Sequence, residues 1–103
     1  YHLKQMAYFV ERLKATPEGD GTMLDNSLLL YGSGMSDGNL HIPTDVPTLV
    51  VSGKSFDIKG GRYLQAPPGR TPMAHLQLTI LEKFGFRMEK FGDSTGHLNL
   101  LSV

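Results

Sequence analysis

Apolar residues recur in two segments of the chain with the spacing of one face of an α-helix. The first segment begins almost at Tyr1 and ends at Thr16-Pro17, because proline and the glycines after it cannot continue a helix cheaply. The second begins at Thr71-Pro72, where Thr suits the N-cap and Pro the first helical turn, and it ends before Gly85. Both segments are predicted to be helices. Their apolar positions are Leu3, Met6, Ala7, Val10 and Leu13, and then Ala74, Leu76, Ile80, Leu81 and Phe84.

Short continuous apolar runs between these helices predict strands. Residues 28–31 and 48–52 have the length of buried strands, and each run is closed by a glycine. Residues 56–64 predict a weaker strand or hairpin, and the alternation over 86–91 predicts another strand. The order helix, strand, strand, helix favours an α/β fold, with a short sheet of three to four strands flanked by two helices.

The chain length of 103 residues suits one domain. The helical pattern starts at once, at a Tyr rather than a Met. We therefore expect residues 1–103 to be either a single domain or the C-terminal fragment of a larger one. In the second case the short sheet would belong to a larger α/β sandwich.

Charge and composition narrow the classes of partner. Ten Lys and Arg balance ten Asp and Glu, so the formal net charge is zero. Nucleic-acid and membrane-surface binders normally carry a basic excess, and both classes are disfavoured. No apolar run approaches the roughly 18 residues of a membrane span. The absence of Cys excludes disulfides, thiolate metal sites and a cysteine nucleophile.

Candidate chemistry concentrates in residues 32–41, a glycine-rich loop directly after the first predicted strand. In open α/β sheets, ligands bind beyond the carboxyl ends of strands, where loops bring polar groups together. The loop's glycines would let its backbone approach a ligand closely. A plain turn, in which Asp and Asn bond to nearby backbone groups, explains the same composition. The polar side chains of the loop are Ser33, Ser36, Asp37, Asn39 and His41.

Two site chemistries compete for this loop. Asp37 and His41 are candidate ligands for Zn²⁺, Mn²⁺ or a similar ion that acts as a Lewis acid, although a site needs at least three ligands. Alternatively, Ser36 lies in a G-x-S-x-G pattern, which is typical of the nucleophile elbow of serine hydrolases. That motif requires a helix after the turn, whereas residues 39–47 carry two prolines and no helical period.

The remaining histidines have simpler interpretations. His75 lies beside the apolar stripe of the second helix, so we predict a packed or partly exposed side chain rather than a base. His97 could reach a site only if the tail folds back over it. Asp93 and His97 follow Ser36 in the chain order of a hydrolase triad, but they lie unusually close together.

Residues 24–39 read LDNSLLLYGSGMSDGN, and residues 47–53 read PTLVVSG. These motifs resemble the C-terminal portion of a secreted bacterial family catalogued as domain of unknown function 1552, and the resemblance covers most of the chain. It continues through KGGR at 59–62, the Thr71-Pro72 pair and FGDSTG at 91–96. The family is in turn remotely similar to the alkaline phosphatase and sulfatase superfamily.

This resemblance implies metal-assisted hydrolysis of a phosphate or sulfate ester in an intact parent protein. It implies a small-molecule or carbohydrate ester as substrate and an extracellular or periplasmic location. Asp37 and His41 would then be metal ligands, and the isolated chain would be inactive because other ligands lie upstream. One departure from the superfamily pattern is that residues 38–40 separate this Asp from its His.

Three functions therefore stay open at the level of sequence. The first is a segment of a metal-assisted ester hydrolase that uses Asp37 and His41. The second is a small serine esterase with Ser36 as nucleophile. The third is a non-catalytic structural module that forms a homo-oligomer, because a truncated sheet leaves edges and apolar faces uncovered.

Overall fold

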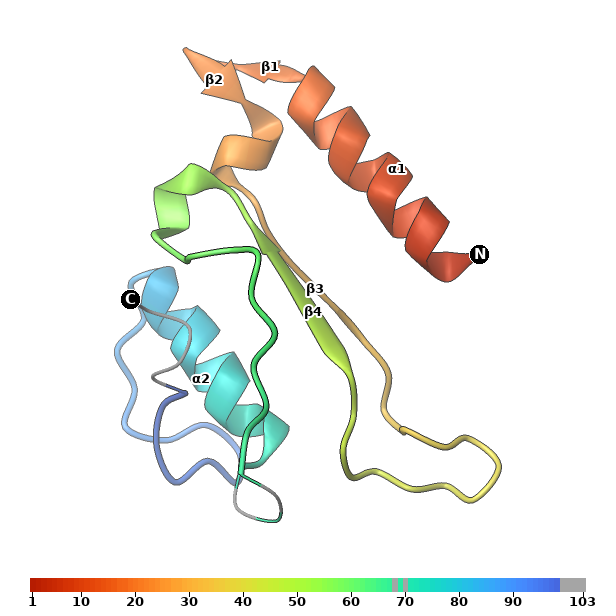
Figure 1. Cartoon of the computed structure of the whole chain (residues 1–103). Helices are drawn as coiled ribbons and strands as arrows, with labels where there is room; N and C mark the ends of the chain where they lie inside the picture. The colour runs from red at the N-terminus through yellow and green to blue at the C-terminus, as the bar shows by residue number, and fades with distance from the viewer. Residues whose placement is uncertain (68, 70, 99–103) are drawn as a thin grey trace. The chain divides into compact units, whose positions relative to one another are not determined.

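The computed structural model describes residues 1–67, 69 and 71–98, which form two compact units (Figure 1). The first unit combines Tyr1–Tyr31 with Leu49–Asp57. The second combines Gly32–Thr48 with the chain from Ile58 onward. The described residues contain both α-helices and β-strands, which confirms the predicted mixed α/β content. No helix among them has the length and apolar character that crossing a bilayer requires.

The first unit begins with helix α1 (His2–Ala15), which confirms the first predicted helix. Arg12 and Lys14 lie in its last turn, where positive side chains interact favourably with the helix dipole. Strands β1 (Pro17–Glu18) and β2 (Gly21–Thr22) follow as a short antiparallel hairpin. The pattern predicted only the end of a helix here, because strands this short carry no periodicity.

The two predicted central strands are confirmed as β3 (Leu28–Gly32) and β4 (Thr48–Ser52), which pair with each other. The N–H of Gly53 donates to the carbonyl of Ser27 at 2.8 Å, so the pairing continues one step beyond the strands. The sheet prediction needs correction, since the described strands form two separate antiparallel sheets of two strands each rather than one sheet of three to four.

The missing strands have a local cause in the backbone. Residues 56–64 were expected to be extended, but the 3-10 turn η2 (Lys54–Phe56) runs into this segment. Asp57 and Gly61 then adopt left-handed φ values of 52° and 69°, which interrupt a strand ladder. No strand forms over residues 86–91 either. An alternating pattern of side chains does not form a strand unless a partner strand offers backbone hydrogen bonds.

Gly53 is the only buried residue of the first unit among those described. Its Cα faces the backbone carbonyls of Leu24 and Asp25 in the 3-10 turn η1 (Met23–Asn26), and a Cβ would overlap both oxygens. Glycine is required here by close backbone approach. Every apolar side chain of α1, β3 and β4 is at best half-buried, so this unit has no enclosed core of its own.

The second unit is built around helix α2 (Met73–Lys83), which confirms the second predicted helix. Its N-cap is Pro72 rather than the expected Thr71. Its C-terminus is closed as predicted by Gly85 at φ 88°, with the amides of Gly85 and Phe86 donating to the carbonyls of Glu82 and Leu81. The buried side chains of the unit are Ala74, His75, Leu76, Leu78, Thr79 and Ser94.

Candidate functional site

The loop that joins β3 to β4 folds on itself through the Asp37 side chain. Its Oδ1 accepts hydrogen bonds from the amides of Asn39 and Leu40, at 2.9 and 3.0 Å. The backbones of Asp37 and Ile42 form an isolated antiparallel bridge. His41 completes the turn in a left-handed conformation, with φ 56°. The plain-turn interpretation therefore describes the local hydrogen bonding of Asp37.

The same bonds orient one of the two candidate metal ligands. Asp37 is half-buried, and its Oδ1 is held by the backbone while its Oδ2 accepts nothing from the described residues. The His41 side chain is exposed. A carboxylate and an imidazole are suitable donors for Zn²⁺ or a similar ion. The turn therefore offers one oriented carboxylate oxygen and one accessible imidazole.

The number of ligands falls short of a complete metal site. Within the part of the chain that the structure describes, no group of three or more Asp, Glu or His side chains is placed to hold an ion. Asp37 and His41 thus fit a metal in their chemistry but not in their number, since protein sites use at least three ligands. Any complete site would need donors from outside these residues.

Ser36 is part of the same turn. Its amide donates to the carbonyl of Ile42 at 2.8 Å, and its hydroxyl donates to the same oxygen at 3.2 Å. The residues after it form turns rather than a helix. The G-x-S-x-G segment thus lacks the strand–turn–helix context of a nucleophile elbow.

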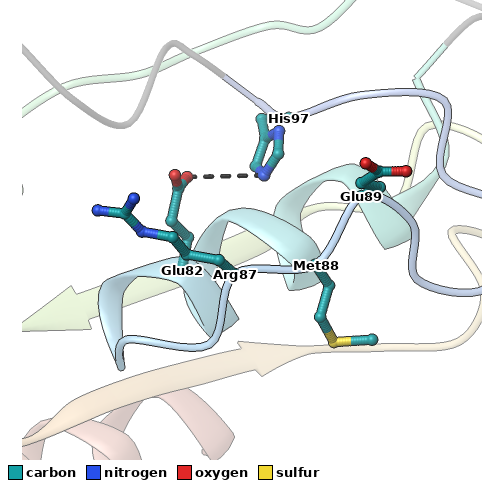
Figure 2. Close-up of a pocket in the computed structure, with 5 residues that line it drawn as sticks. All are labelled: Glu82, Arg87, Met88, Glu89 and His97. Carbon is teal, nitrogen blue, oxygen red and sulfur yellow. Dashed lines mark ion pairs between the residues drawn. The ribbon is translucent and has the colours of Figure 1, made fainter.

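His97, the triad candidate in the tail, lies beside α2. Its Nε2 is 3.6 Å from Oε2 of Glu82, and the two side chains line an open cavity of about 350 Å³ (Figure 2). The other lining residues are Arg87, Met88 and Glu89. Figure 2 shows the Arg87 and Glu89 head groups directed to opposite sides, away from His97. The polar groups of this cavity do not converge on a common point where a ligand could bind.

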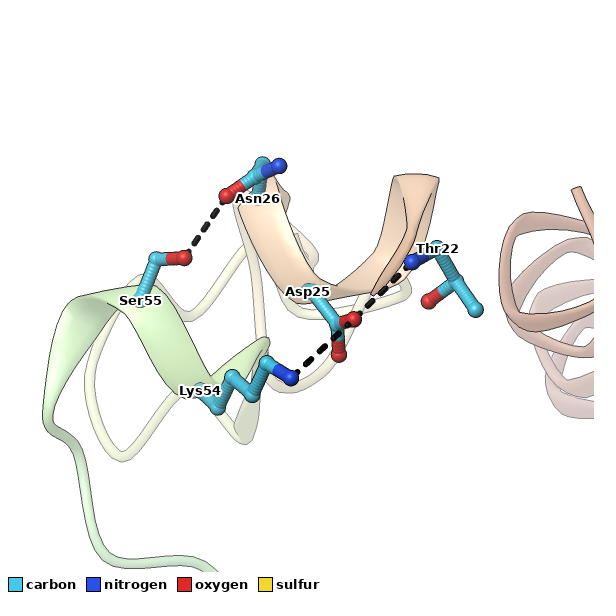
Figure 3. A network of polar contacts seen from close by, with 5 residues as sticks. All are labelled: Thr22, Asp25, Asn26, Lys54 and Ser55. Atoms are coloured by element: carbon cyan, nitrogen blue, oxygen red, sulfur yellow. Dashed lines mark hydrogen bonds and ion pairs between the residues drawn. The ribbon is translucent and has the colours of Figure 1, made fainter. Parts of the chain in front are cut away.

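A second polar cluster ties η1 to η2 in the first unit (Figure 3). Oδ2 of Asp25 accepts the Thr22 amide at 2.9 Å and lies 3.6 Å from Nζ of Lys54. The Thr22 N–H is the main reason that the pKa of the Asp25 carboxyl lies below its usual value, with Lys54 adding to the effect against partial burial. The Ser55 hydroxyl donates to Oδ1 of Asn26 at 2.6 Å. These bonds join two turns, and no group of three or more Asp, Glu or His among the described residues is placed there to hold an ion. The cluster is structural.

His75 is buried, with 8% of its surface exposed, which is the packed one of the two placements predicted for it. Its ring contacts Thr95 of the tail, which the pattern of apolar residues did not anticipate. The contact joins positions 20 residues apart in the chain. A signal was nevertheless present, because a His among the buried positions of a helix needs a hydrogen-bond partner.

Comparisons with protein-family models, with curated proteins and with solved structures give no match to this chain. They neither support nor contradict the resemblance to domain of unknown function 1552. That resemblance, and the activity it implies, stay predictions.

Proposed function

We propose that the chain is a segment of a metal-assisted ester hydrolase, within a larger α/β sandwich that is extracellular or periplasmic. Asp37 and His41 would supply part of its metal centre. The observation that carries this proposal is the state of Asp37, whose Oδ1 is fixed by two backbone amides while its Oδ2 accepts nothing from the described residues. A carboxylate oriented in this way is prepared to bind a cation through its second oxygen.

The proposal also predicts what the isolated chain can bind and hydrolyse. Two donors cannot complete a site, so the remaining ligands and the nucleophile would belong to other parts of an intact protein. The chain by itself is then expected to bind a divalent ion weakly and to hydrolyse no ester. The bound ion, when the site is complete, would polarise a phosphate or sulfate ester oxygen.

Replacing Asp37 with Asn tests the metal role. The amide has no negative charge, so we expect the affinity of the chain for Zn²⁺ to fall by about tenfold or more. Isothermal titration calorimetry with zinc chloride measures this. Asp45→Asn is the matched control, because Asp45 is an exposed carboxylate in the same loop and also has a left-handed φ, 54°. Identical affinities for the wild type and Asp37→Asn, or no binding by either, would contradict the metal role.

The alternative of a Ser36 esterase has less support. The Ser36 hydroxyl donates to a backbone carbonyl within its own turn rather than to an imidazole. His97, its candidate base, lies 3.6 Å from Glu82 instead. No hydrogen bond among the described residues joins this hydroxyl to a base.

We propose as the second candidate a non-catalytic module that associates with a second copy of itself. The observation that favours it is the first unit, in which α1 has an apolar stripe but no buried residue. Leu3 on that stripe is 64% exposed. The formal net charge of zero also favours a second copy as the partner, because neutral copies do not repel one another. Burying the stripe against its counterpart would remove apolar surface from water.

Replacing Leu3 with Glu tests this association. A charge on the stripe should weaken the dimer at least about tenfold, since a buried Leu contributes roughly 1.5–3 kcal/mol. Sedimentation equilibrium over a range of concentrations measures the dissociation constant. Gln5→Glu introduces a carboxylate at an exposed position outside the stripe and should leave the dimer intact. A wild-type chain that stays monomeric at every concentration rules out self-association.

A further inference from the structure

Two side chains of α2 accept hydrogen bonds from the backbone of the C-terminal segment 91–98. Nε2 of His75 accepts the amide of Thr95 at 2.9 Å, and Oγ1 of Thr79 accepts the amide of Leu98 at 2.8 Å. Residues 75 and 79 are four apart, so they lie on the same face of the helix. Figure 1 shows this segment, in blue, running beside α2, in cyan. The helix therefore fastens the segment at two points one turn apart.

The segment is shaped by its own contacts before it reaches these two points. The Ser94 hydroxyl, in a residue only 3% exposed, accepts the amide of Phe91 at 2.8 Å. The Ser94 amide donates to the Phe91 carbonyl at 3.0 Å. Gly92 lies against Ala74 of α2, since the Cβ that Gly92 lacks would stand 3.7 Å from that of Ala74. The turn over 91–94 thus places Thr95 within hydrogen-bonding distance of His75.

The bond from Thr95 defines the protonation state of the imidazole. An amide N–H can donate only to a nitrogen with a free lone pair, and Nε2 has one only when the ring is neutral and carries its proton on Nδ1. The Thr95 hydroxyl is also 2.9 Å from Nε2, so it shares this lone pair with the amide. The backbone N–H of Thr95 already occupies that lone pair. His75 therefore does not act as a base that activates the Thr95 hydroxyl as a nucleophile.

Protonation of His75 would place a second N–H opposite the Thr95 amide. Only the Thr95 hydroxyl could then accept from Nε2, and the amide would lose its acceptor. The new positive charge would lie in a residue that is 8% exposed. No carboxylate among the described residues pairs with His75. The other titratable groups on α2 and the segment are Glu82, Lys83, Asp93 and His97.

We propose that His75 is a pH-sensitive clasp for segment 91–98. The neutral imidazole holds the segment on α2, and protonation of the ring at Nε2 releases it, because the Thr95 amide then has no acceptor. The ion pair between His97 and Glu82 responds in the opposite direction, because it forms when His97 is charged. Its side chains are 34% and 51% exposed, so it is weak and does not reverse the effect of the buried group.

Nuclear magnetic resonance of the whole chain measures the clasp directly. We expect a scalar coupling across the hydrogen bond between the Thr95 amide nitrogen and Nε2 of His75 at about pH 8, and its loss as the ring takes up a proton. Protection of the Thr95 and Leu98 amides from hydrogen exchange, corrected for the intrinsic rate, should fall on the order of tenfold over the same range.

Two variants separate the His75 clasp from other effects of pH. In His75→Gln, Oε1 can take the place of Nε2 as an acceptor that does not titrate, so protection should persist at low pH. His97→Gln removes the other imidazole near the segment and should leave the pH dependence unchanged. The proposal is overturned if the coupling is absent at high pH, or if the ring stays neutral over the whole pH range in which the chain is folded. It is also overturned if protection of the Thr95 amide is unchanged once the ring is protonated.

Discussion

Replacing Leu78 with Ala will lower the free energy of unfolding of the chain by about 2–4 kcal/mol. Leu78 is the one fully buried large side chain among the described residues, with 0% of its surface exposed. Truncation removes its transfer free energy and leaves a cavity that the surroundings fill only in part. The buried neighbours on α2 are few, so the second unit has little other apolar contact to preserve it. Urea unfolding followed by circular dichroism measures the loss.

Leu40→Ala is the control for this prediction. It makes the same chemical change in the same unit, but Leu40 is 65% exposed and contributes its amide, not its side chain, to the Asp37 turn. Its effect should stay within about 0.5 kcal/mol. Equal losses for the two variants would show that Leu78 does not form the core of the second unit.

Replacing Gly53 with Ala will destabilise the first unit by on the order of 3 kcal/mol. The added methyl group would overlap the backbone carbonyl oxygens of Leu24 and Asp25. Backbone atoms cannot rotate away as a side chain can, so η1 must shift. That shift strains the bond from the Gly53 amide to the Ser27 carbonyl, which is 2.8 Å long. Thermal and urea unfolding of the whole chain measure the effect.

Gly60→Ala serves as the comparison, because its Cβ would meet nothing within 4 Å and its φ is not left-handed. That variant should have unchanged stability or gain up to about 1 kcal/mol from the lower entropy of its unfolded chain. A Gly53→Ala protein as stable as Gly60→Ala would mean that the close approach of η1 to Gly53 is not maintained in solution.

The helices were predictable because their determinants are local. The apolar period, the proline at the start of α2 and the glycine at φ 88° after it act over a few residues. The sheet was less predictable, because a strand forms only where a partner strand offers its hydrogen bonds. Residues 86–91 alternate as well as many strands do, and they form none.

The candidate site, like the fold, was predictable only in its local features. From the sequence, the loop after β3 was either a functional site or a plain turn in which Asp and Asn bond to nearby backbone groups. Asp37 does make such bonds, with the amides of Asn39 and Leu40. The sequence could not predict whether a third ligand joins Asp37 and His41. Convergence of ligands depends on contacts between distant parts of a chain, which spacing does not encode.

The sequence by itself determined two helices, the central strands β3 and β4, and a charge balance that disfavours nucleic acid as a partner. Only the tertiary structure decided that the strands remain in two separate pairs and that Gly53 is fixed by the backbone of η1. It also decided that His75 holds a segment 20 residues away. The physical reason is range, because propensities and caps act between neighbours whereas burial and long-range hydrogen bonds exist only after the chain has folded.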